Sequence, residues 1–138
     1  MAEKGREFWS AIPFRAIPYD IESMKRCFAE MQAQGLLLIA EEGGAIYGGI
    51  GGVAAPAYFN NSYLLGSERF WWLDPAKRAG RTGLLLIRGM EDAARKAGCH
   101  FFAMMALESS DPDRAAFIYN RLGFEPSERM YLKRLSWA

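Results

Sequence analysis

The sequence has few of the residues that build metal centres and disulfide frameworks. Its 138 residues include two cysteines, Cys27 and Cys99, and one histidine, His100. Neither a C-x-x-C pair nor a metal-ligand spacing occurs, so we expect no disulfide framework and no metal site. This cysteine usage is typical of a reduced protein of the cytoplasm, and we expect a cytoplasmic location.

Long apolar runs and an excess of charge are also lacking. No apolar run approaches the ~20 residues that a membrane-spanning helix needs, and no apolar segment follows the charged first seven residues, as a secretion signal requires. Seventeen Lys and Arg stand against sixteen Asp and Glu, for a net charge of +1. This balance lacks the broad positive field of nucleic-acid-binding proteins. We therefore expect no membrane partner and no nucleic-acid partner.

The hydrophobic content, 51%, is enough for one compact core in a chain of this length, so we expect one domain over residues 1–138. Residues 1–17, which include Pro13, are expected to be irregular. Apolar residues at three- and four-residue spacing predict three helices, over 21–34, 83–97 and 112–122. Apolar and aromatic runs predict strands over 36–40, 45–53, 62–73, 99–107 and 130–135, with a loop over 54–62. This order predicts an α/β (α+β) fold with a mixed sheet.

The most informative segment is Arg78-Ala79-Gly80-Arg81-Thr82-Gly83, between an aromatic strand ending at Leu73 and the second predicted helix. The first turn of a helix offers unpaired backbone N–H groups and the positive end of the helix dipole. The glycines let this backbone approach a ligand closely, and Lys77, Arg78 and Arg81 add positive charge. The segment predicts a phosphate site, and hence a phosphorylated cofactor.

A second segment, Tyr119-Asn120-Arg121-Leu122-Gly123-Phe124, ends the last predicted helix. Two interpretations of it stay open on the residues alone. Tyr119 fits a core aromatic at helical spacing, with Gly123 as an ordinary helix C-cap. A phenol there can also serve as a proton donor in acyl transfer.

Together these segments resemble the GNAT superfamily of acetyl-CoA-dependent N-acetyltransferases, over roughly residues 36–135. The shared elements are Leu73-Asp74-Pro75, then Arg78-x-x-Arg81-x-Gly83, then Tyr119-x-x-x-Gly123-Phe124. The loop pattern of that family is R/Q-x-x-G-x-G/A, and Arg81 stands where the first glycine is usual. Its backbone N–H can still donate if its φ is negative. An asparagine that bonds pantetheine in many members has no clear counterpart in residues 111–114.

The resemblance implies a single GNAT-like domain, with a central mixed sheet whose parallel strands splay and with helices on its flanks. It implies acetyl-CoA as co-substrate and, as acceptor, a primary amine of a small molecule or peptide that attacks the thioester directly in a ternary complex. Tyr119 would protonate the departing thiolate, and the Leu73 N–H would contact the thioester carbonyl. The residues implied to hold the cofactor are Leu73, Arg78, Ala79, Gly80, Arg81, Thr82, Gly83 and Leu84.

The general base is less defined. Glu68, at the start of the aromatic strand, is the first candidate, and the alternative interpretation is an exposed carboxylate at a strand edge. Glu108, or a chain of water molecules without a dedicated base, stays open as well. Arg81 and the missing asparagine also leave a second function open, a non-catalytic acyl-CoA-binding or protein-interaction module. Small size and aromatic content are compatible with a homodimer.

Overall fold

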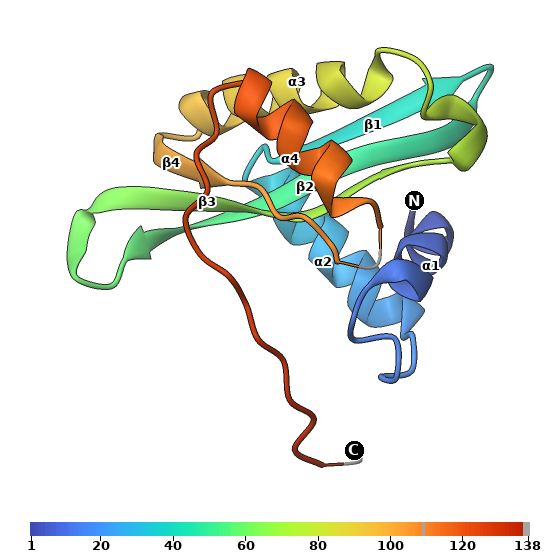
Figure 1. Ribbon diagram of the computed structural model, residues 1–138, viewed down its shortest axis with the longest axis horizontal. Coiled ribbons are helices and arrows are strands. Elements are labelled where there is room, and N and C mark those ends of the chain that lie inside the picture. The colour runs from blue at the N-terminus through green and yellow to red at the C-terminus, as the bar shows by residue number, and fades with distance from the viewer. Residues whose placement is uncertain (109, 137–138) are drawn as a thin grey trace.

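The computed structural model describes residues 1–108 and 110–136. Its centre is a four-stranded sheet in the order β1-β2-β3-β4. Strands β1 (Leu37–Glu42), β2 (Ala45–Ala57) and β3 (Asn60–Leu73) are antiparallel neighbours, and β4 (Cys99–Ala103) runs parallel to β3. Helices α3 (Thr82–Lys96) and α4 (Pro112–Arg121) lie on one face of this sheet, and α1 (Ala2–Ala11) and α2 (Ile21–Ala33) lie on the other (Figure 1). The α/β fold with a mixed sheet is confirmed.

The predicted helix ends are confirmed by their capping groups. The Asp20 side chain accepts the Glu22 N–H at 3.1 Å, and the Asp111 side chain accepts the Arg114 N–H at 3.2 Å, which satisfies first-turn donors of α2 and α4. After α2, α3 and α4, the chain turns through glycines with left-handed φ values of +73°, +88° and +87°, at Gly35, Gly98 and Gly123. Local sequence therefore sets where these helices begin and end.

Two predictions from the first half of the chain are wrong. Residues 2–11 form α1 instead of an irregular segment, because β3 supplies its packing surface: Phe8 lies edge-on to Phe70 and Trp72. The predicted loop over 54–62 is mostly strand, since β2 continues to Ala57 and β3 begins at Asn60.

Within the described chain, no helix is both long and apolar enough to cross a membrane.

The strands predicted after α3 are also shorter or missing. The apolar run over 99–107 is a strand only from Cys99 to Ala103, and beyond that point the chain leaves β3. Residues 130–135, predicted as a last strand, are extended but pair with no strand, and the segment runs away from the domain (Figure 1). A strand needs a neighbouring edge as well as a suitable sequence, and this segment lies beside none.

Two cores hold β3 in place from opposite faces. On the α3 side, the largest fully buried side chains are Leu36, Ile50, Ile87 and Met90. On the α2 side, Met31 and Phe70 pack so closely over Gly51 that a Cβ there would lie 2.6 Å from the Met31 sulfur and 2.5 Å from the Phe70 ring. Because side chains alternate along a strand, Trp71 belongs to the first core and Trp72 to the second.

Candidate functional site

The parallel strands β3 and β4 part within the sheet. They pair only from Leu64 opposite Cys99 to Ser67 opposite Ala103, after which β4 ends. β3 continues to Leu73, so among residues 1–108 and 110–136 no strand lies beside residues 68–73 on this side. The splay that the resemblance implied is present, and it leaves a gap bordered by the second half of β3.

The backbone at the end of β3 faces this gap. The Asp74 N–H donates to the Tyr47 carbonyl at 2.8 Å, which makes that pair a hydrogen-bonded one. Bonded and non-bonded pairs alternate in an antiparallel ladder, so Leu73, opposite Gly48, directs its N–H and C=O away from β2. The Leu73 carbonyl accepts the Arg78 Nε at 2.9 Å. The Leu73 N–H therefore points into the gap as a backbone donor.

The loop between β3 and α3 presents a row of unpaired amides. The Leu85 N–H bonds to the Arg81 carbonyl at 3.0 Å. The four N–H groups before it, from Arg81 to Leu84, have no hydrogen-bond partner within residues 1–108 and 110–136. Arg81 has a negative φ, −90°, so its backbone N–H can donate to a ligand as a glycine at this position would. With the positive end of the α3 dipole behind them, these amides can hold an anion such as a diphosphate.

The charged side chains at the loop differ from the predicted set. Arg78 turns back onto the sheet, with its guanidinium 4.3 Å from the centre of the Trp72 ring. Lys77 pairs with Glu42 of β1. Arg81 is exposed, and Arg114 of α4 reaches the loop, donating to the Arg78 carbonyl at 3.4 Å. Beside the exposed Arg81, Arg114 brings positive charge to this loop, and its place there could not be found without knowing where α4 lies.

The two loop glycines differ in what they require. Gly80 has open space where a Cβ would stand, and its φ is not left-handed. A Cβ on Gly83 would lie 3.3 Å from the Trp71 ring, tighter than ordinary van der Waals contact. Gly83 therefore allows the start of α3 to rest directly on β3, which places the free amides beside the gap.

Glu68 and Tyr119, predicted as base and acid, meet at one residue of the segment that follows β4. The Met105 N–H donates to the Glu68 carboxylate at 2.9 Å, and the Tyr119 hydroxyl donates to the Met105 carbonyl at 2.7 Å. The side chains come from β3 and α4, separated by about fifty positions in sequence. The structure thus brings both predicted reactive groups to the edge of the gap.

Glu68 is in the middle of β3 and 6% exposed, so its interpretation as an exposed strand-edge carboxylate is wrong. Burial raises the pKa of this carboxyl to about 7, against the opposing effect of the hydrogen bond from Met105. Tyr119 is also buried, and its burial together with the nearby Glu68 charge raises the pKa of the phenol well above 10. Near neutral pH, the carboxyl can accept a proton and the phenol retains one.

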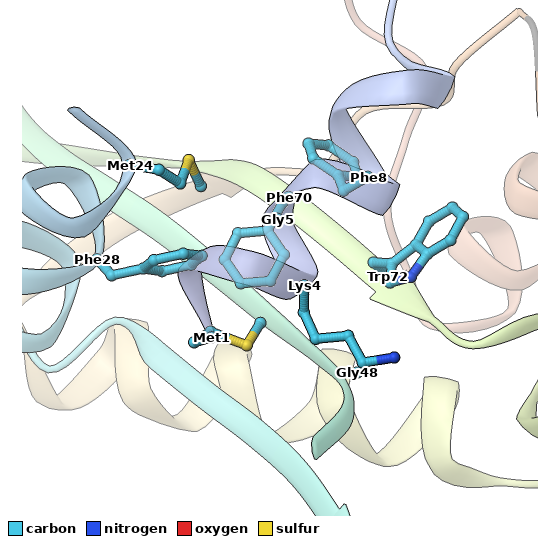
Figure 2. Close-up of a pocket in the computed structure, with 9 residues that line it drawn as sticks. All are labelled: Met1, Lys4, Gly5, Phe8, Met24, Phe28, Gly48, Phe70 and Trp72. Carbon is cyan, nitrogen blue, oxygen red and sulfur yellow. The ribbon is translucent and has the colours of Figure 1, made fainter. Parts of the chain in front are cut away.

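The remaining residues considered for the site are Glu108 and the two neighbouring tryptophans of β3. Glu108 is exposed. Trp71 lies 5.8 Å from the Tyr119 ring, and its buried indole N–H has no partner in the described chain. Trp72, on the other face, lines a small cavity under α1 with Phe8 (Figure 2). That cavity, about 10 Å³, holds one water molecule at most and is no substrate pocket.

The site can therefore hold an anion at the amides of residues 81–84 and an extended group in the gap beside the Leu73 N–H. A carboxyl able to accept a proton and a phenol able to donate one stand at the end of that gap. Among the described residues, no group of three or more His, Cys, Asp or Glu side chains is placed to hold a metal ion.

Comparison with known proteins identifies the same family that the sequence motifs resemble. A model of the acetyltransferase (GNAT) family matches residues 5–124. Solved structures share the fold. Glucosamine-6-phosphate N-acetyltransferase from Arabidopsis thaliana has TM-score 0.70 and 16% identity, over 99% of this chain and 95% of that one. A predicted acetyltransferase with acetyl-CoA from Clostridium acetobutylicum has TM-score 0.68 and 17% identity, over 96% and 84%. A Trypanosoma brucei acetyltransferase has TM-score 0.66 and 20% identity, over 86% and 82%. No curated protein sequence matches significantly.

Proposed function

Since the chain belongs to the acetyltransferase (GNAT) family, we propose that it moves the acetyl group of acetyl-CoA to a primary amine. The observation that carries this proposal is the row of unpaired amides from Arg81 to Leu84, placed beside the gap between β3 and β4. The amides and the Arg81 side chain would bind the diphosphate of the co-substrate. The pantetheine arm would then lie along the unpaired half of β3.

On this proposal, the thioester oxygen would lie in the gap within reach of the Leu73 N–H. A backbone donor there would stabilise the negative charge that develops on that oxygen during attack. The indole N–H of Trp71, buried without a protein partner in the described chain, is a second donor that a bound amide carbonyl could satisfy. Trp71 would thus supply a contact in place of the missing asparagine.

Glu68 is the proposed general base and Tyr119 the proposed general acid. An ammonium acceptor must lose a proton before it attacks, and a carboxyl with a pKa of about 7 can take that proton, directly or through water. The amine nitrogen then bonds to the acetyl carbon as the carbon–sulfur bond breaks, and the new amide nitrogen releases its extra proton to water. Tyr119 would give its proton to the thiolate sulfur and regain one from solvent, exchanging its bond to the Met105 carbonyl for one to sulfur.

The acceptor is proposed to be a small molecule or peptide in the cytoplasm that enters opposite the co-substrate. An alternative is supported by two observations: the loop carries Arg81 in place of the usual glycine, and the Tyr119 hydroxyl already has a partner. On this alternative the protein binds acyl-CoA without turnover.

Calorimetry and a thiol-release assay separate these possibilities. On the proposal, CoA binds the wild-type chain, and a panel of amines with acetyl-CoA includes acceptors that release CoA thiol. CoA binding without transfer to any amine of a broad panel supports the alternative. Failure to bind CoA contradicts both, because each depends on the amides at residues 81–84.

A further inference from the structure

The side chain of Arg78 is fixed in place, but its charge has no counter-charge in the described chain. Its Nε donates to the Leu73 carbonyl at 2.9 Å, and its guanidinium lies 4.3 Å from the centre of the Trp72 ring. Among residues 1–108 and 110–136, no Asp or Glu side chain forms an ion pair with it. The residue is partly buried. A guanidinium that loses water without gaining a carboxylate is unfavourable, so a bound anion would stabilise it.

This guanidinium and the free amides at the start of α3 lie on opposite faces of β3. Trp72, on which the guanidinium stacks, belongs to the core on the α1 side, where Phe8 packs against it (Figure 2). Gly83, within the row of free amides, rests on Trp71 on the α3 side. An anion at the Arg78 side chain is therefore a different group from the diphosphate proposed to bind at the amides.

The donors that Arg78 has left fit an oxyanion. With Nε bonded to the Leu73 carbonyl, the two Nη groups have no hydrogen-bond partner in the described chain. They form a planar pair that can donate to two oxygens of one carboxylate or phosphate. Asp74, the next residue after Leu73, does not take them, because both of its oxygens accept from the Lys4 Nζ of α1, at 3.1 and 3.2 Å.

We propose that the Nη groups of Arg78 bind the acceptor, and that the acceptor is a small primary amine carrying a carboxylate or a phosphate. This inference rests on the proposed acetyl transfer and names the class of acceptor. Leu73 connects the two parts: its N–H is the proposed contact of the thioester oxygen, and its carbonyl holds Arg78. Both groups of an extended residue point the same way. The anion is thus held close to the reacting carbon, a few bonds from the attacking nitrogen.

The first test compares primary amines with and without the anion. Glycine, β-alanine and γ-aminobutyrate are each paired with their carboxamide, and phosphoethanolamine is paired with ethanolamine. Thiol release from acetyl-CoA gives kcat/KM for each amine. We expect the wild type to prefer the anionic member of at least one pair by roughly tenfold to hundredfold, because hydrogen bonds to a charged group are gained. The pair with the larger preference tells a carboxylate acceptor from a phosphate acceptor.

Variants of the same loop assign that preference to its residue. Arg78→Met removes the charge, keeps a long side chain against Trp72 and should abolish the preference. Arg78→Lys keeps the charge without the paired Nη groups and should retain part of it. Lys77→Met, the matched control, removes a positive charge that is paired with Glu42 and should keep it in full. A wild type without preference overturns the proposal. So does an Arg78→Met variant that slows both members of a pair equally, since Arg78 then only supports Leu73.

The second test measures binding without turnover. With isotope-labelled protein and CoA, which carries no acetyl group, NMR follows the Arg78 Nε–H and the Trp72 indole N–H as each amine is added. The anionic amines should shift both signals and their neutral partners should not. In Arg78→Met, the shift at Trp72 should vanish. No shift with any anionic amine, or equal shifts with charged and neutral amines, overturns the proposal.

The two tests separate this inference from acetyl transfer itself. Shifts that only the anionic amines cause, without thiol release from any amine, support the anion site and contradict the transfer. Thiol release without preference for anionic amines contradicts the anion site and leaves the transfer standing.

Discussion

Glu68 and Tyr119 bind the same residue from two sides: the carboxylate accepts the N–H of Met105, and the phenol donates to its carbonyl. A change in the position of residue 105 therefore acts on both groups at once. The Glu68 charge also contributes to the raised pKa of Tyr119. The protonation states of the two are thus linked, and each should be tested by its own substitution.

The proposed base should appear in the pH profile of the reaction. With a pKa of about 7, Glu68 is protonated and inactive below neutrality, so kcat/KM should rise with pH up to about 7. Glu68→Gln should lower kcat/KM by roughly 10²- to 10⁴-fold and remove that inflection. Glu108→Gln is the matched control and should keep it. If Glu108→Gln removes the inflection instead, Glu108 is the base.

The same raised pKa should affect stability. The folded state holds the Glu68 proton more tightly than the unfolded chain, whose glutamate has a pKa near 4.5. The free energy of unfolding should therefore fall as pH rises from about 4.5 to about 7, by roughly 3 kcal/mol from this group. Glu68→Gln should lack this loss. Urea unfolding of both proteins at pH 5 and pH 8 measures the difference, and parallel pH dependences would contradict the burial of a titrating Glu68.

Tyr119→Phe removes the phenol and keeps the ring that packs against Trp71 and Phe124. On the proposed role, turnover with a true acceptor should drop by roughly ten- to ten-thousand-fold while the fold is kept. Steady-state kinetics between pH 6 and 9, with circular dichroism as a check on folding, make the measurement. Unchanged turnover across this range would remove Tyr119 from the mechanism.

Trp71 and Trp72 form a matched pair for testing the gap, since both have buried indole N–H groups but face opposite sides of the sheet. Trp71→Phe should raise the KM for acetyl-CoA about fivefold, because one hydrogen bond to the co-substrate is worth about 1 kcal/mol. Trp72→Phe should leave that KM nearly unchanged. An equal rise in both variants would point to a general loss of packing in place of a contact with the co-substrate.

The stability of β2 should depend on Gly51. An added methyl group would meet the Met31 sulfur and the Phe70 ring at less than 3 Å, so Gly51→Ala should lower the free energy of unfolding by about 1–3 kcal/mol. Gly80→Ala is the control, because open space surrounds that position. Urea denaturation of both variants, compared at the same pH, gives the two values. Equal stability would mean that the cores rearrange around residue 51 without cost.

The sequence by itself determined the features that depend on neighbouring residues. Asp20, Asp111 and the glycines after the helices set the helix ends, and the segment from Arg78 to Gly83 indicated an anion site, because capping and turn conformations are local. Gly83 and Tyr119 were found through two motifs, each of which spans only six neighbouring residues.

Only the tertiary structure decided the features that depend on distant partners. α1 forms against β3, β4 ends where its pairing with β3 ends, and the segment over 130–135 forms no strand because no edge lies beside it. In sequence Glu68 resembles a surface carboxylate, and its raised pKa comes from burial in the folded chain, where Met105 of the segment after β4 contacts it. Burial and strand pairing are set by residues far apart in the chain, so local pattern could not supply them.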